Sequence, residues 1–122
     1  MGLESYQKGL AGEEIARQYL LQRGYEIVAS NYHSSQGEID IIAKDKDCLV
    51  FVEVKSFSFR SFDSPVSAVG YTKKKSIIHA AHDYLYKNQI KDIYSRFDIL
   101  TIYKRFNGQT VIEHYQDAFY VN

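Results

Sequence analysis

Hydrophobic residues recur at helical spacing in two stretches of the chain. Residues 4–23 show this pattern, and Gly24 follows them as a C-terminal cap would. Residues 73–88 repeat it, with Thr72 placed to cap the first turn. The pattern therefore predicts one helix at the start of the chain and another in its second half.

Five shorter stretches have the composition of strands. They cover residues 25–29, 37–43, 48–56, 97–103 and 110–115. The third is an almost continuous apolar run, which is typical of a central strand covered on both faces. Asn107-Gly108, between the last two strands, is a strong hairpin signal. This order predicts an α/β sandwich, αβββαββ, with a mixed central sheet flanked by two helices.

The connections are polar or contain turn-forming residues. Residues 30–36 are polar and turn-like, and residues 56–70 contain the only proline of the chain, Pro65. The second connection also carries Phe57, Phe59 and Phe62. We expect it to form a loop that makes an interface or a substrate contact.

Length and composition bound the class of protein. A chain of 122 residues fits one domain, so we expect residues 1–122 to form a single domain. Its 45% hydrophobic and 25% charged residues are those of an ordinary globular protein. No apolar run approaches the ~18–20 residues that cross a bilayer, and residues 1–8 have no apolar signal core. We expect a cytoplasmic protein with no membrane partner.

The net charge is zero, which gives no global signal for nucleic acid. The distribution is uneven, because residues 1–53 hold nine acidic and five basic side chains while residues 54–122 hold six and ten. A metal-binding half beside a phosphate-binding half would give this distribution, and so would chance clustering.

Charged residues interrupt two of the predicted strands, as Asp40 in the second and as Glu53 and Lys55 in the third. Burying a carboxylate costs several kcal/mol, as an order of magnitude, unless it is paired or bound to a metal. Side chains alternate along a strand, so Glu53 and Lys55 point to the same face. If the two strands are neighbours, all three side chains converge at one end of the sheet.

Such a set suits a hard divalent cation and a phosphate. Asp40, Glu53 and the Val54 carbonyl would supply oxygen ligands for Mg²⁺ or Mn²⁺, and Lys55 would orient or deprotonate an attacking water or stabilise the phosphate. Phosphodiester hydrolysis by metal-activated water is the reaction these groups fit. The alternative is an ion pair of Glu53 and Lys55 on a half-exposed strand, with Asp40 near a turn.

The same residues carry a resemblance. Asp40 with Glu53-Val54-Lys55, in the order αβββαβ, resembles the PD-(D/E)-x-K nuclease superfamily, which includes restriction endonucleases and archaeal Holliday-junction resolvases. The match is closer to the YraN-like family of small bacterial proteins. Its pattern is met along almost the whole chain, including Gly12-Glu13, Gly24-Tyr25, residues 37–43 and 51–55, Lys73 and Arg96-Phe97-Asp98. The resemblance implies a restriction-endonuclease-like fold and nucleic-acid binding.

The resemblance also implies roles for single residues. Asp40 and Glu53 correspond to the metal carboxylates of the superfamily, and Lys55 to its catalytic lysine. Glu13 corresponds to an acid that many members place on the first helix as a further catalytic group and metal or water ligand. The alternative for Glu13 is a surface ion pair with Arg17, one helical turn later.

Lysines open the second predicted helix, at Lys73, Lys74 and Lys75. Cations at a helix N-terminus oppose the macrodipole, and a bound phosphate would reverse that effect. We therefore expect Lys73, Lys74 and Arg60, in the preceding loop, to contact nucleic acid. A solvated basic face is the alternative.

The first functional hypothesis is a Mg²⁺-dependent, nuclease-like protein that acts on DNA. The low overall charge favours selection of DNA structure over sequence, and cutting both strands would need a homodimer. The second hypothesis is a nucleic-acid-binding module without catalysis, accessory to a helicase or recombination protein. The third is a protein-interaction adaptor.

Overall fold

The structure is a computed structural model that describes residues 3–57 and 69–120. Its elements are α1 (Leu3–Gln22), β1 (Glu26–Ser34), β2 (Gly37–Asp45), β3 (Cys48–Phe57), α2 (Tyr71–Lys87), β4 (Tyr94–Lys104) and β5 (Thr110–Phe119). This order confirms the predicted αβββαββ arrangement. Neither helix in the described part of the chain has the length and hydrophobicity needed to cross a membrane.

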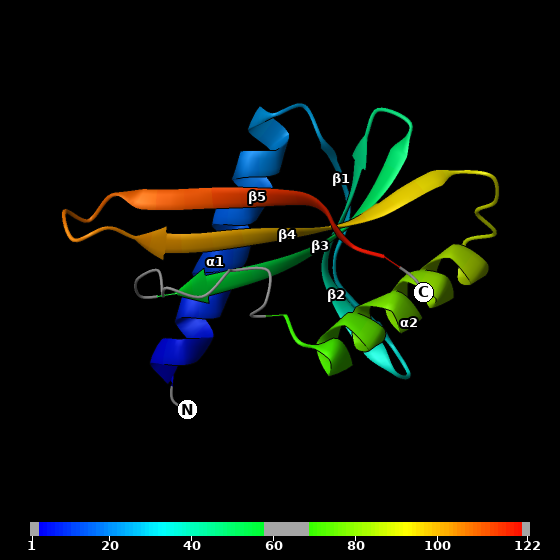
Figure 1. Cartoon of the computed structure of the whole chain (residues 1–122), viewed down its shortest axis with the longest axis horizontal. Coiled ribbons are helices and arrows are strands. Elements are labelled where there is room, and N and C mark those ends of the chain that lie inside the picture. Colours follow the sequence, from blue (N-terminus) through cyan, green and yellow to red (C-terminus); the bar gives the residue numbers. More distant parts are fainter. Residues whose placement is uncertain (1–2, 58–68, 121–122) are drawn as a thin grey trace.

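The strands form one mixed sheet in the order β1-β2-β3-β4-β5. Neighbouring strands are antiparallel except β3 and β4, which are parallel. A parallel pair needs a crossover connection, and α2 lies in that connection. The topology is that of a restriction-endonuclease-like fold, with β3 in the centre, as its apolar run predicted (Figure 1).

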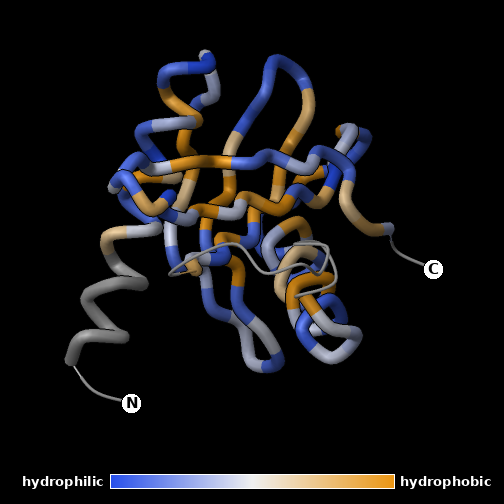
Figure 2. Tube along the Cα trace, turned by 60° about the vertical axis from the view of Figure 1, so that its left-hand side comes forward, coloured by the Kyte–Doolittle hydropathy of each residue, from blue (hydrophilic) through white to orange (hydrophobic). Residues whose placement is uncertain are grey.

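The two helices bury opposite faces of the sheet. On the α1 face, Val50 and Val52 belong to a cluster with Ala16 and Leu20 of the helix. On the α2 face, Leu49 and Phe51 belong to a second cluster, which includes Ile77, Ala80, Ala81 and Tyr84 of that helix. Hydrophobic residues follow the strands through the middle of the molecule, while the hairpin tips are hydrophilic (Figure 2). Residues 49–53 of β3 are buried, so a charge in this part of the strand is removed from bulk water.

Two edge strands are longer than predicted. β1 extends through residues 30–34, which were predicted as a turn, and β5 continues to Phe119. In β1, exposed and half-buried positions alternate along much of the strand, so its polar residues mark a solvated strand side rather than a break. Asn31 has a φ of 52° within β1, and Asp117 a φ of 54° within β5. These left-handed residues lie inside strands.

The start of α2 differs from the prediction. Thr72 was predicted as the N-cap, but the helix begins at Tyr71 and Gly70 is its N-cap. Gly70 has no side chain, so no side-chain hydrogen bond caps the first turn. The Thr72 prediction is therefore wrong. By contrast, the hairpin at Asn107-Gly108 is confirmed, with a φ of 86° at Gly108.

Two glycines bring the helices close to the sheet. A Cβ atom on Gly37, at the start of β2, would lie 2.0 Å from the carbonyl oxygen of Ser76 in α2. A Cβ atom on Gly12 of α1 would lie 2.1 Å from the Oγ atom of Ser56 in β3. Only glycine allows α2 to pack directly on the β1–β2 hairpin.

We expect Gly37→Ala to lower the free energy of unfolding by about 3 kcal/mol, because the added methyl group must displace helix backbone. Ser35→Ala changes an exposed residue of the same hairpin and should stay within about 0.5 kcal/mol of the wild type. Urea denaturation of both variants measures the difference. Equal stability of the two variants would show that α2 does not pack on Gly37.

Candidate active site

The site begins where β2 and β3 stop pairing. The antiparallel ladder between them runs from Asp45 and Cys48 to Ile41 and Val52. At the next position the Asp40 carboxylate replaces a backbone carbonyl, because the backbone N–H of Val54 donates to Asp40 Oδ2 at 2.8 Å. This bond holds the half-buried Asp40 side chain against β3, beside Glu53.

Glu53 is the buried acid of the site, with only 3% of its surface exposed. Burial raises the pKa of Glu53 to about 9, and a hydrogen bond with Asp40 and the negative charge of Asp40 act in the same direction. The nearby charges of Lys73 and Lys55 lower it in part. The neutral form of Glu53 is therefore favoured at neutral pH, with a hydrogen bond to Asp40.

Lys73 of α2 lies over this carboxylate pair. Its Nζ atom is 3.7 Å from Glu53 Oε2 and 3.3 Å from Glu38 Oε1. Burial lowers the pKa of Lys73, but the charges of Glu53 and Glu38 outweigh burial and raise it. The sequence predicted Lys73 as a nucleic-acid contact, and the structure places this ammonium group beside the acids.

Lys55 lies two residues beyond Glu53 in β3 and faces the same side of the sheet. Its positive charge acts on Glu53 and lowers the pKa of that carboxyl group. Asp40, Glu53 and Lys55 thus gather at one end of the β2–β3 ladder, as the sequence predicted.

Glu13 reaches the site from α1. Burial raises the pKa of this half-buried side chain, the charge of Asp40 raises it further, and a hydrogen bond with Asn31 lowers it. Arg17 pairs instead with Glu14, at 2.7 Å between Nη2 and Oε2. The structure thus brings Glu13 within electrostatic reach of Asp40 and gives the Arg17 ion pair to Glu14.

The carboxylates of the site are the groups that could bind a divalent cation. In the described residues, no group of three or more His, Cys, Asp or Glu side chains is arranged to hold a metal ion. Asp40 and Glu53 form a pair, and Glu13 is not assembled with them. Mg²⁺ is commonly bound by one or two carboxylates together with waters and substrate phosphate. The pair therefore fits a cation site that a phosphate would complete.

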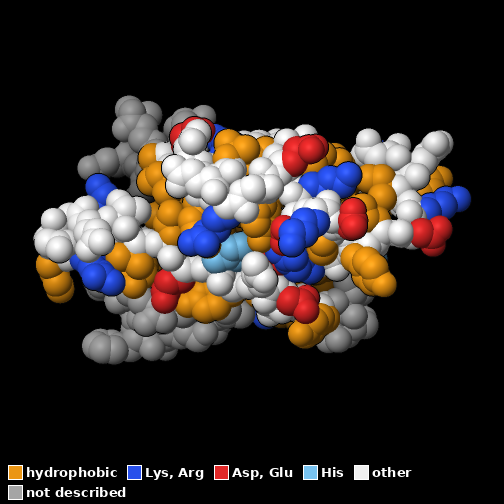
Figure 3. All heavy atoms as spheres, turned by 90° about the horizontal axis from the view of Figure 1, so that it is seen from above, with side chains coloured by type: hydrophobic (Ala, Val, Ile, Leu, Met, Phe, Trp, Pro, Cys, Tyr) orange, Lys and Arg blue, Asp and Glu red, His pale blue; other side chains and the backbone are white. Residues whose placement is uncertain are grey.

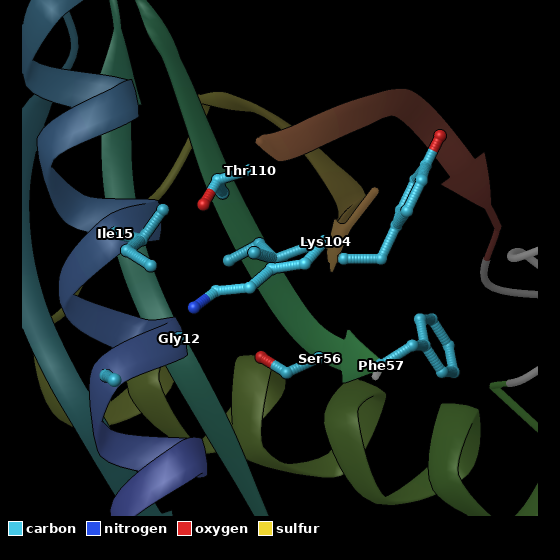
Figure 4. Close-up of a pocket in the computed structure, with 9 residues that line it drawn as sticks. Gly12, Ile15, Ser56, Phe57, Lys104 and Thr110 are labelled. Atoms are coloured by element: carbon cyan, nitrogen blue, oxygen red, sulfur yellow. The ribbon is translucent and has the colours of Figure 1, made fainter. Parts of the chain in front are cut away.

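A cavity of about 470 Å³ lies on the other side of β3, between α1 and the ends of β3, β4 and β5. Gly12 and Ser56 line one side of it, and the Lys104 amine points toward α1 near Ile15 (Figure 4). Ser56 and Lys55 are successive strand residues and face opposite sides of the sheet. The cavity is therefore separate from the carboxylate pair.

Sequence reasoning missed Thr101 of β4. Its register partner in β3 is Lys55, and its side chain is fully buried. Its Oγ1 atom has no hydrogen-bond partner among the described residues. A threonine in an apolar strand gives no signal of such a position, because threonine is a common strand residue. The hydroxyl group is a free hydrogen-bonding group next to the proposed catalytic lysine.

Asp98, which the sequence marked only as part of the Arg96-Phe97-Asp98 motif, lies at the centre of a second buried polar cluster. Its carboxylate accepts hydrogen bonds from Arg96 Nε at 3.0 Å and from the backbone N–H of Asp117 at 2.9 Å. His114 Nε2 lies 2.7 Å away. Burial raises the pKa of Asp98, but these partners outweigh burial and hold it below its usual value. The cluster ties β4 to β5.

Some predicted residues lie outside the described part of the chain. These are Arg60, Phe59 and Phe62, in the connection between β3 and α2. Lys74 is described, and it faces away from the carboxylates toward Phe119, with its Nζ atom 5.8 Å from the ring centroid.

Residues 12–102 match the profile of the Uncharacterised protein family UPF0102. The chain belongs to the UPF0102 family, which is the YraN-like family. A UPF0102 protein of Clostridioides difficile is 41% identical over 96% of this chain and 100% of its own length. A UPF0102 protein of Flavobacterium psychrophilum is 38% identical over 92% of each chain.

One solved structure with partial similarity is that of Pyrococcus furiosus SfsA in complex with Ca²⁺. It has a TM-score of 0.39 and 13% sequence identity to this chain. The match covers 92% of this chain and 63% of SfsA, so the UPF0102 chain spans less than two thirds of that protein. The fold assignment rests on the order of elements and strands.

We expect Glu53→Gln to stabilise the metal-free protein more at pH 8 than at pH 5. The pKa of about 9 in the folded protein lies above the ordinary value of 4.5. Between these values folding takes up a proton, so the stability of the wild type falls as pH rises, and the variant lacks this loss. Urea denaturation in EDTA at both pH values measures it.

Glu14→Gln is the control, because Glu14 is an exposed acid of α1 whose partner Arg17 lowers its pKa. This variant should not gain stability as pH rises. A stability difference for Glu53→Gln that is the same at both pH values would show that Glu53 is ionised in the folded protein.

Proposed function

We propose that this protein is a Mg²⁺- or Mn²⁺-dependent nuclease that hydrolyses phosphodiester bonds in DNA. The observation that carries this proposal is the buried Asp40–Glu53 pair, with Lys73 and Lys55 beside it, where β2 and β3 separate. A carboxylate pair in a central sheet destabilises a small domain, so its presence calls for a ligand. The resemblance to PD-(D/E)-x-K nucleases supports the same reaction.

Asp40 and Glu53 are the residues that would hold the cation, with the Val54 carbonyl as a further oxygen donor. The cation would supply a nucleophilic water at neutral pH and polarise the phosphate. The N–H of Val54 already fixes one Asp40 oxygen, so this ligand is oriented before any cation arrives.

Lys55 and Lys73 would have different roles in the reaction. Lys55, on the same face as Glu53, is placed to orient the attacking water and to stabilise charge on the phosphate. Lys73 would draw a substrate phosphate toward the pair, and Glu13 would hold a water from the α1 side.

The distribution of charge bears on the kind of DNA that the protein would select. The net charge is zero, and on the face shown in Figure 3 acidic and basic side chains are interspersed instead of gathered by sign. Few phosphate contacts mean weak binding along a plain duplex, so selection depends on DNA structure. A homodimer would be needed to cut both strands, and a helicase or recombination protein is a fitting partner.

We expect titration calorimetry to detect Mg²⁺ or Mn²⁺ binding by the wild type in the presence of a DNA oligonucleotide. Asp40→Asn and Glu53→Gln should each abolish the signal, because each removes one of two anionic ligands. Glu14→Gln should bind as the wild type does. Binding that survives in both site variants would place the cation elsewhere.

We expect Lys55→Ala to keep cation binding and to lose cleavage of DNA by at least about 100-fold, the scale of a single removed catalytic group. Lys91→Ala removes an exposed lysine beyond the end of α2 and should cleave at the wild-type rate. Single-turnover assays on nicked, branched and single-stranded DNA measure both variants. Normal cleavage by Lys55→Ala would overturn the role of this lysine.

A second candidate is a nucleic-acid-binding module without catalysis. One observation favours it, namely that only two carboxylates assemble and no group of three exists in the described residues. DNA binding that does not depend on a cation, with no cleavage of any tested substrate, would select this candidate.

A further inference from the structure

A second surface feature lies between the N-terminal half of α2 and the end of β5. It is a cavity of about 480 Å³, here called the α2–β5 groove, and its lining includes Tyr71, Lys74, Lys75, Phe119 and Tyr120. None of the residues that line it in the described chain is acidic. The groove therefore combines positive charge with aromatic surface.

Two of the aromatic rings are available to a ligand, whereas Phe119 is buried. Tyr71 is 76% exposed and Tyr120 is 67% exposed. The Lys75 Nζ atom lies 5.4 Å from the centroid of the Tyr71 ring, and Lys74 Nζ lies 5.8 Å from that of Phe119. Each lysine thus lies beside an aromatic ring. A nucleic-acid strand needs this combination, because its phosphates bind cations while its bases stack on rings.

The groove and the carboxylate pair share one turn of α2. Lys73 reaches Glu53, whereas the next two residues, Lys74 and Lys75, line the groove. Successive helix residues point about 100° apart with a rise of about 1.5 Å, so the groove and the carboxylate pair lie on different sides of the same short segment of α2. A strand that crosses the start of α2 would meet both.

The first turn of α2 carries electrostatic repulsion in the protein without a ligand. The first turn has no acidic residue, and no side-chain hydrogen bond caps it at Gly70. Three lysines, Lys73 to Lys75, add positive charge to the positive end of the helix dipole. An anion next to the groove would relieve this repulsion.

We propose that the α2–β5 groove binds an unpaired nucleic-acid strand, with bases stacked on Tyr71 and Tyr120 and phosphates on Lys74 and Lys75. Bases inside a duplex stack on one another and cannot stack on these rings, so the groove selects single-stranded segments. The inference rests on the proposed function and names its substrate class, which is DNA with an unpaired strand beside the scissile bond.

The test is fluorescence anisotropy with labelled oligothymidylate in EDTA, where no cleavage occurs. Tyr71→Ala and Tyr120→Ala should each weaken binding about tenfold, the usual effect of removing one stacking ring. Tyr71→Phe keeps the ring and should bind as the wild type does. Lys74→Ala with Lys75→Ala should reduce the slope of affinity against salt concentration.

Tyr86→Ala is the matched control, because Tyr86 is 85% exposed near the other end of α2. It should leave the affinity unchanged. Three results would overturn the proposal: wild-type affinity in both tyrosine variants, equally tight binding of a blunt duplex, or equally strong competition by polyglutamate, which would indicate an acidic protein partner.

Failure of the groove and failure of the nuclease give different results. If Asp40→Asn abolishes cleavage while the tyrosine variants bind and cleave normally, the groove proposal alone is wrong. If the tyrosine variants lose oligothymidylate binding but the wild type cleaves no DNA with Mg²⁺ or Mn²⁺, the groove proposal is supported and the nuclease proposal is wrong.

Discussion

The hydrogen bond from the Val54 N–H to Asp40 is the interaction on which the site depends. Two strands can separate inside a protein only if the backbone groups they leave behind find other partners. Asp40 supplies that partner from its side chain, so β2 can turn away from β3 without an orphaned donor. The opening admits Lys73 from α2 and brings Asp40 near Glu13 of α1. The same hydrogen bond therefore satisfies the backbone N–H of Val54 and positions the Asp40 carboxylate in the site.

The burial of Glu53 decides how the site balances its charge. Two carboxylates in contact inside a sheet cannot both be ionised without a compensating cation. In the metal-free protein, burial favours the neutral form of Glu53, and Lys73 and Lys55 offset the remaining negative charge in part. A divalent cation would displace the proton and gain from the low dielectric that makes the pair unfavourable alone. Desolvation that lowers stability thus raises affinity for a cation.

The sequence predicted the parts of the site that depend on periodicity. Glu53 and Lys55 share a face because side chains alternate, and Asp40 joins them because short connections favour neighbouring strands. Lys73 could not be paired with Glu53, since that contact depends on how α2 packs on the sheet, which Gly37 controls. The strand at residues 30–34 was predicted as a turn because an edge strand tolerates the polar residues that otherwise mark connections. Thr101 carries no sequence signal, because it stands out only by the lack of a hydrogen-bond partner for its hydroxyl group among the described residues.

The lysines at the start of α2 have different surroundings, which the sequence alone does not distinguish. Lys73 turns inward to the acids, whereas Lys74 turns to the buried ring of Phe119 and Lys75 to the exposed ring of Tyr71. A chain without net charge has no overall electrostatic attraction for a duplex, so phosphate contacts must come from local groups of lysines. Stacking supplies affinity that does not require charge, and it is open only to unpaired bases. The absence of a net positive charge and the exposure of Tyr71 and Tyr120 therefore favour the same kind of substrate.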